Sequence, residues 1–174
     1  MTMTLDGSAS VTINSGAILG ITSGTAVAST SGTSIDFTGL PAWVKRITLM
    51  FNEVSVSGTS SFLIQLGTGA TTFTTTGYVA TGGSFSSGGS NQFGSTIGMP
   101  IFSNTGSAKF SGTMTISNIT GNTWVSSHSG KYTTNNSNVG GGVIALGAVL
   151  TAVRFTTFNG TDTYNAGTVN IIYE

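Results

Sequence analysis

Apolar and polar residues alternate with a period of two through much of the chain, and this period is typical of β-strands. In residues 45–56, Ile47, Leu49 and Phe51 alternate with a second set that includes Met50, so apolar groups lie on both faces. This pattern predicts a central strand with both faces covered. No stretch repeats apolar residues at the helical spacing, so no helix is expected. Shorter runs predict further strands at residues 34–37, 62–66, 97–102 and 168–173.

Residues 108–132 predict a β-hairpin whose register depends on the length of its loop. A two-residue loop at residues 120–121 would turn Trp124 away from the face of Ile116, because a shift of one residue exchanges the faces. A three-residue loop at residues 119–121 brings Trp124 opposite Ile116 and puts glycine at the left-handed position. We therefore expect the three-residue loop.

A second hairpin is predicted at Asn159 and Gly160, because this pair lies between two runs rich in threonine and aromatic residues. An Asn-Gly pair in this setting favours a type I′ turn. Such a turn places Phe155 opposite Tyr164.

These signals together predict an all-β protein with about ten short strands. The expected fold is an antiparallel β-sandwich of jelly-roll-like form. Residues 1–32, rich in Gly, Ser, Thr and Ala, are expected to form an N-terminal lead-in arm or edge strands, and residues 33–174 the sandwich. Residues 67–107, interrupted by paired glycines, are expected to hold long surface loops.

Composition changes this picture in one respect, because the chain is polar without being charged. Charged residues make up 6% of the 174 residues, five basic against five acidic, while the hydrophobic fraction is 38%. A folded chain is expected, since disorder usually couples low hydrophobicity to high net charge. Nucleic acid and membrane insertion are not expected, because no basic patch or long apolar run occurs. Low charge also favours association with other subunits.

Catalytic and metal-binding signals are sparse. The chain has one histidine, His128, and no cysteine, so no metal site and no cofactor are expected. His128 lies among serines in a predicted strand, and no nucleophile motif accompanies it. Asp36 and Glu53, the candidate carboxylate pair, both lie in predicted strands. These features favour a protein that is not an enzyme.

Aromatic residues supply the candidate contacts for a partner. Trp43 and Trp124 are expected in the core, as most aromatics of a sandwich are. Tyr78 and Tyr132 lie beside glycines and polar loops and are expected to be exposed. Aromatic side chains stack on sugar rings, so Tyr78, Tyr132 and His128 are the candidates for receptor contact.

Three segments resemble one family. Residues 31–51 (SGTSIDFTGLPAWVKRITLMF), 121–125 (GNTWV) and 156–174 (TTFNGTDTYNAGTVNIIYE) are similar to segments of small bacteriophage virion proteins and of C-terminal domains of phage tail-fibre proteins. The resemblance implies a virion protein made in the bacterial host cytoplasm. It implies no catalytic residues.

Two functions fit that context. In the first, the chain is a tail-fibre or receptor-binding component whose loops near residues 82–94 and 133–142 contact a host surface glycan. In the second, it decorates the capsid and binds other virion proteins through its N-terminal arm. A separate carbohydrate-binding module is a third, less favoured class. We expect the tail location and a homotrimer.

Overall fold

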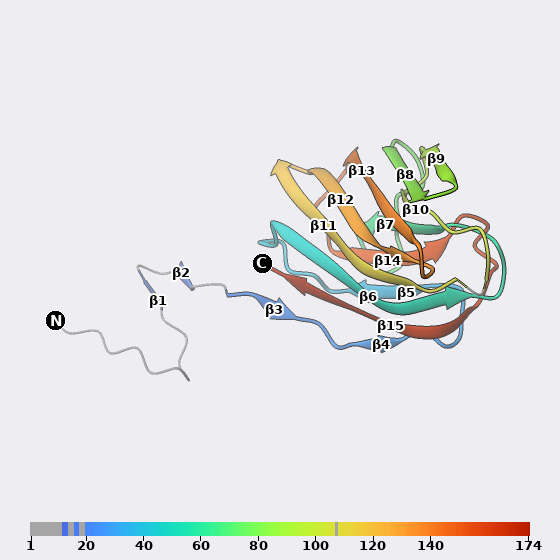
Figure 1. Ribbon diagram of the computed structural model, residues 1–174. Coiled ribbons are helices and arrows are strands. Elements are labelled where there is room, and N and C mark those ends of the chain that lie inside the picture. Colours follow the sequence, from blue (N-terminus) through green and yellow to red (C-terminus); the bar gives the residue numbers. More distant parts are fainter. Residues whose placement is uncertain (1–11, 14–15, 18–19, 107) are drawn as a thin grey trace.

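The computed structural model describes residues 12–13, 16–17, 20–106 and 108–174, and its secondary structure in these residues consists of β-strands. Two sheets face each other as a sandwich (Figure 1). The larger, nine-stranded sheet contains, in spatial order, β3 (Thr22–Ser23), β15 (Tyr164–Tyr173), β6 (Arg46–Val56), β11 (Phe110–Thr120), β12 (Thr123–Tyr132), β13 (Asn136–Ala145), β8 (Val79–Ser86) and β9 (Gly89–Ser95), with β4 (Val27–Ala28) also paired to β15.

The smaller, four-stranded sheet has the order β10 (Met99–Ile101), β7 (Phe62–Gly67), β14 (Ala152–Thr157) and β5 (Ile35–Thr38). The strands β1 (Thr12–Ile13) and β2 (Gly16–Ala17) pair with each other. Neighbouring strands of both sheets pair antiparallel in the described residues. The predicted all-β antiparallel sandwich is therefore confirmed, and its jelly-roll connectivity stays a prediction. β6, with 11 residues, confirms the long strand predicted at residues 45–56, whereas the expectation of short strands is wrong for β11, which also has 11 residues.

The core lies between the two sheets and is rich in aromatic rings. The ring of Phe155 from the small sheet lies 5.0 Å from Phe51 and 5.0 Å from Tyr164 of the large sheet, centroid to centroid. Ile47 and Leu49 of β6 are fully buried in the same cluster. β6 has β15 on one side and β11 on the other, which confirms its predicted central position. Burial of these apolar groups is the main force that holds the sheets together.

The described part of the N-terminal region lies along β15. Gly24 N–H donates to the Ile171 carbonyl at 2.8 Å, and Ser29 N–H donates to the Gly167 carbonyl at 2.9 Å. Residues 22–29 therefore extend the edge of the large sheet. Residues 1–11, 14–15 and 18–19 of the predicted arm lie outside the described residues.

The expectation of long loops in residues 67–107 is wrong, because β8 and β9 lie there, while β10 confirms the strand predicted at residues 97–102. Glycines that look like turn residues belong to strands, where a neighbouring backbone comes close. A Cβ on Gly82 would stand 2.6 Å from the Pro100 carbonyl oxygen, and one on Gly83 would stand 2.5 Å from that of Asn91. The expected loop at residues 133–142 is shortened for the same reason, since β13 contains Gly140 packed against β8.

The loop of the β11–β12 hairpin is shorter than predicted, but Trp124 lies on the predicted face of the sheet. Its turn has two residues, Gly121 and Asn122, with Trp124 opposite Asn118 and an irregularity between Asn118 and Thr120. Gly121 has the expected left-handed conformation, with φ +51°. The extra residue of the irregularity restores the alternation, so Trp124 still faces the core.

The predicted hairpin at Asn159 and Gly160 is wrong. β14 belongs to the small sheet and β15 to the large one, so the chain crosses the sandwich between them. The Asn159 side chain forms the turn: its Oδ1 accepts from the N–H groups of Thr161 at 3.1 Å and Asp162 at 3.2 Å. An Asn side chain used in this way supports a turn without strand pairing. Phe155 and Tyr164 meet as rings across the core instead.

Candidate functional site

The carboxylates in the described residues take part in contacts that hold the fold. Asp36 of β5 accepts two hydrogen bonds from Arg154 of β14, at 2.8 and 2.7 Å. Glu174 pairs with Arg46, and Asp162 accepts from the Ser60 backbone N–H at 3.0 Å. Hydrogen bonding to Asp36 raises the pKa of the Arg154 guanidinium above its usual value. Asp36 and Glu53 lie in different sheets, so the register does not bring them together as a pair.

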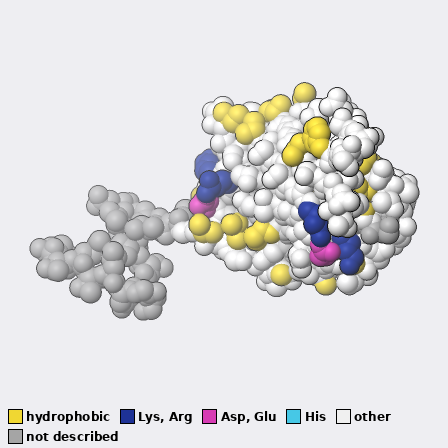
Figure 2. All heavy atoms as spheres, in the orientation of Figure 1, with side chains coloured by type: hydrophobic (Ala, Val, Ile, Leu, Met, Phe, Trp, Pro, Cys, Tyr) yellow, Lys and Arg dark blue, Asp and Glu magenta, His cyan; other side chains and the backbone are white. Residues whose placement is uncertain are grey.

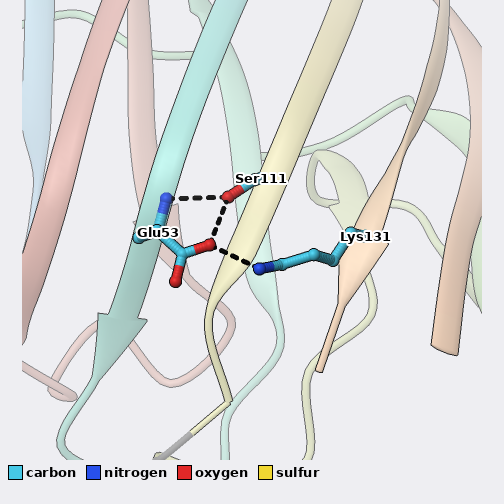
Figure 3. A network of polar contacts seen from close by, with 3 residues as sticks. All are labelled: Glu53, Ser111 and Lys131. Carbon is cyan, nitrogen blue, oxygen red and sulfur yellow. Dashed lines mark hydrogen bonds and ion pairs between the residues drawn. The ribbon is translucent and has the colours of Figure 1, made fainter. Parts of the chain in front are cut away.

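Glu53 forms a small network that crosses three strands of the large sheet. Its carboxylate oxygen Oε1 accepts from Lys131 Nζ of β12 at 2.6 Å and from Ser111 Oγ of β11 at 2.9 Å. The Glu53 backbone N–H donates to the same Ser111 Oγ at 2.9 Å. Figure 3 shows Lys131 reaching toward Glu53 across β11. The Lys131 contact, followed by the Ser111 hydrogen bond, lowers the pKa of Glu53.

A strained backbone places the Glu53 carboxylate in this network. Glu53 has φ +52°, a conformation that side-chain-bearing residues rarely adopt, and the β6–β11 register shifts beside it. It lines a surface depression of about 300 Å³ together with Lys109, Lys131 and Thr134. Because the Lys131 charge is already paired with Glu53, we assign this network to fixing the irregular register and not to ligand binding.

The strain at Glu53 predicts that alanine is less stable than glycine at this position, the reverse of the order at a regular strand position. Both Glu53→Ala and Glu53→Gly remove the network, but alanine keeps the left-handed strain, which costs about 1 kcal/mol. We expect Glu53→Ala to be the less stable variant by that amount in urea unfolding. At Thr48, a regular position of β6, glycine should be the less stable by about 0.5–1 kcal/mol. The same order at both positions would contradict the role given to the backbone of Glu53.

His128 lies inside the sandwich and not on its surface, with 5% of the residue exposed. Its Nε2 lies 3.0 Å from Oδ1 of Asn138, whose Nδ2 donates to the Phe102 carbonyl at 2.7 Å. Since that amide nitrogen is the donor, Oδ1 accepts and Nε2 carries the imidazole proton. Nδ1 is buried without a hydrogen-bond partner among the described residues. Burial lowers the pKa of His128 below its ordinary value, although the Asn138 contact opposes this shift.

The lowered pKa of His128 predicts a loss of stability in weak acid. Below the ordinary value of 6.5, the unfolded chain binds a proton that the folded chain does not, so the free energy of unfolding falls as the pH falls. The fall is at most about 1.4 kcal/mol per pH unit. We expect urea unfolding between pH 7.5 and 5.5 to show this fall, and His128→Gln to remove it. Equal slopes in the two proteins would contradict it.

Tyr78 and Tyr132 are buried as well, each with 1% exposed, so their predicted exposure is wrong. The Tyr78 hydroxyl accepts the Leu66 N–H at 2.8 Å, and burial raises the pKa of Tyr78 to about 12. The Tyr132 hydroxyl accepts the Asn104 N–H at 2.7 Å and donates to Asn104 Oδ1 at 2.8 Å. Both side chains hold loops against the sandwich. The three predicted receptor contacts are therefore not presented on the surface of the chain.

Trp124 is buried as predicted, while Trp43 is partly buried against the core. The Trp43 ring lies 5.9 Å from the Tyr173 ring, which covers one side of it.

A row of polar side chains on the outer face of the small sheet was not predicted from the sequence. Register places Arg154 of β14 opposite Asp36 of β5 and opposite Gln65 of β7. A depression of about 260 Å³ lies beside the row and is also lined by Thr156 and Asn159. Asp36, Gln65 and Arg154 are each a polar residue within a short run of apolar residues. This interruption is the sequence signal by which the row could have been found.

Comparisons with family models, with curated proteins and with solved structures found no match for this chain. In the described residues, no helix is long and apolar enough to cross a membrane.

Proposed function

We propose that this chain is a non-enzymatic structural subunit of a bacteriophage particle and serves as a tail-fibre or receptor-binding component. The observation that carries the proposal is the use of its few charges. Asp36 of β5 pairs with Arg154 of the neighbouring β14, and Glu53 of β6 pairs with Lys131 of β12 across the intervening β11. Glu174 pairs with Arg46 of β6, so all three carboxylates have a structural use. Figure 2 shows basic and acidic side chains side by side in two places on an otherwise largely uncharged face.

The resembling segments support the same proposal. Residues 31–51 include β5 and the first half of β6, and residues 156–174 include the end of β14 and all of β15. These strands pair with each other or lie side by side in the two sheets. The resemblance to phage virion proteins thus falls on the framework of the sandwich, where a shared fold would require it.

Analysis of purified particles tests the virion assignment. The phage that encodes the chain is banded in a density gradient and its proteins are quantified by mass spectrometry. We expect the chain in the particle band at a fixed ratio to the major capsid protein. Recovery of the chain only from the soluble lysate would overturn the proposal.

The outer face of the large sheet supports assembly of the chain with copies of itself. Its neighbouring strands place Thr113, Ser129 and Val139 in one row, and Val139 and Phe85 line one depression of about 110 Å³. Half of Phe85 is exposed. Uncharged side chains such as these avoid like-charge repulsion when identical surfaces meet around a symmetry axis. The proposed assembly is a homotrimer that contacts other virion proteins.

A lysine on that face is expected to disrupt the trimer. Analytical ultracentrifugation should give a mass three times the 17.6 kDa of one chain for the natural protein. Val139→Lys would place three like charges at the interface and should give monomers. Val149, a comparably exposed valine of the 146–151 segment, provides the control, and Val149→Lys should remain trimeric. A monomeric natural protein, or two variants with the same mass, would contradict this interface.

A further inference from the structure

Two residues of the polar row, Gln65 and Arg154, line an open depression on the small sheet. We call trough the depression lined by Ser34, Gln65, Arg154, Thr156, Phe158 and Asn159. Its volume of about 260 Å³ is smaller than that of pockets for drug-sized ligands, which begin at about 300 Å³. The trough therefore has room for one small ring at a time.

The polar groups of the trough are fixed before any ligand arrives. Arg154 is held by both oxygens of Asp36 and by the Phe73 ring, whose centroid lies 4.0 Å from the guanidinium carbon. Gln65 Nε2 donates to the Ile97 carbonyl at 3.0 Å, and Thr156 Oγ1 donates to the Thr33 carbonyl at 2.8 Å. Groups held in this way lose little side-chain entropy on binding.

Burial of two of these groups also distinguishes the trough from ordinary surface. Gln65 and Thr156 are 8% and 7% exposed, and both still line it. A polar side chain placed this deep costs free energy unless its hydrogen bonds are made. Each makes one such bond within the chain, and the amide oxygen of Gln65 and the lone pairs of the Thr156 hydroxyl are acceptors for a ligand.

The charge of the trough decides the class of ligand. The Arg154 cation is paired with the Asp36 anion, so the row has no excess charge to favour phosphate, sulfate or a carboxylate. Asp36 uses two of the five N–H donors of Arg154, which leaves three for other acceptors. Donors and acceptors that alternate along a row match the neighbouring hydroxyls of a sugar ring, and Phe158 adds an apolar surface for its C–H face.

We propose that the trough binds a neutral sugar residue. The identity of the sugar as part of a bacterial surface glycan rests on the proposed receptor-binding function. The sugar specificity itself rests on the trough alone, so the two can fail separately.

The test uses the purified full chain and saturation-transfer NMR. The probes are glucose, galactose, mannose and N-acetylglucosamine, their short oligomers, and inorganic phosphate as the anion control. We expect at least one neutral sugar to bind and phosphate not to bind. Ser34→Trp should fill the trough and weaken binding by about tenfold or more. Val149→Trp adds an indole ring at an exposed position outside both the trough and the proposed trimer interface, and should leave binding unchanged.

A second variant guards against misfolding of the first. Gln65→Met keeps the size of the side chain and removes its amide, and should also weaken sugar binding by about tenfold. Binding that survives both variants, or that is confined to phosphate and acidic sugars, would overturn the inference, as would the absence of binding to every probe. If the chain is found in particles and binds no sugar, the inference fails and the proposed function stands. If the chain binds sugar and is absent from particles, the proposed function fails and the sugar-binding inference stands.

Discussion

Replacing Phe155 with alanine is expected to lower the free energy of unfolding by about 3–5 kcal/mol. Phe155 is fully buried, and its ring contacts Phe51 and Tyr164 of the opposite sheet and Phe62 of its own, with centroids 5.0–5.2 Å away. Alanine would leave a cavity between the sheets, and interiors this well packed collapse only partly around such a gap. The loss is large because one ring connects both layers of the sandwich.

Urea unfolding followed by tryptophan fluorescence measures this loss. Ile119→Ala is the control, because it removes a large apolar side chain from a position where 63% of the residue is exposed and which lies outside the proposed trimer interface. Its effect should stay within about 0.5 kcal/mol, as for most surface substitutions. Similar losses for Phe155→Ala and Ile119→Ala would show that the core does not lie where the sandwich places it.

Alanine at Gly112 is expected to lower the free energy of unfolding by about 1–3 kcal/mol or more. A Cβ at this position would stand 2.3 Å from the Ser129 carbonyl oxygen and 2.5 Å from the Gly130 Cα. Both atoms belong to the backbone of β12, so no side chain can move aside. The β11–β12 pair would have to separate or shift, and the neighbouring network at Ser111 would shift with it.

Gly147→Ala is the control for Gly112→Ala, because a Cβ at Gly147 would have no heavy atom within 4 Å. It should change the free energy of unfolding by no more than about 0.5 kcal/mol. The two variants are compared in the same urea titration. An unchanged Gly112→Ala, or a loss shared by both, would contradict the close approach of the two strands.

Periodicity of the sequence was sufficient to predict the framework strands. Ile47, Leu49 and Phe51 define β6 because a period of two places apolar groups on the core face. Trp124 was assigned to the correct face although its loop was not, because an irregularity next to the turn absorbed one residue. Face assignments depend only on alternation, whereas loop lengths depend on local geometry.

Glycines account for most of what the sequence did not reveal. Gly82, Gly83 and Gly140 suggested turns, but they lie in strands where a neighbouring backbone or side chain leaves no space for a Cβ. Tyr78 and His128 have polar sequence neighbours that suggested exposure, and the opposite packing follows from contacts with Leu66 and Asn138. These contacts join residues 12 and 10 positions apart, and they depend on how the strands pair and pack, which has no local signal.

The trough residues also could not be grouped from the sequence. Gln65 and Arg154 could be recognised as polar residues within apolar strands, but strand order decides whether such residues meet. Strand order cannot be read from the sequence, because β5, β7 and β14 are separated by many residues and come together only in the small sheet.

Imaging of the chain on intact particles tests the central claim most directly. The protein is tagged after Glu174, and a gold-labelled antibody against the tag is located by electron microscopy of purified virions. The account predicts label at the distal end of the tail. Label spread over the head would contradict the tail location and establish a decoration protein, and particles without label but with the tag detected in the lysate would contradict the virion assignment itself.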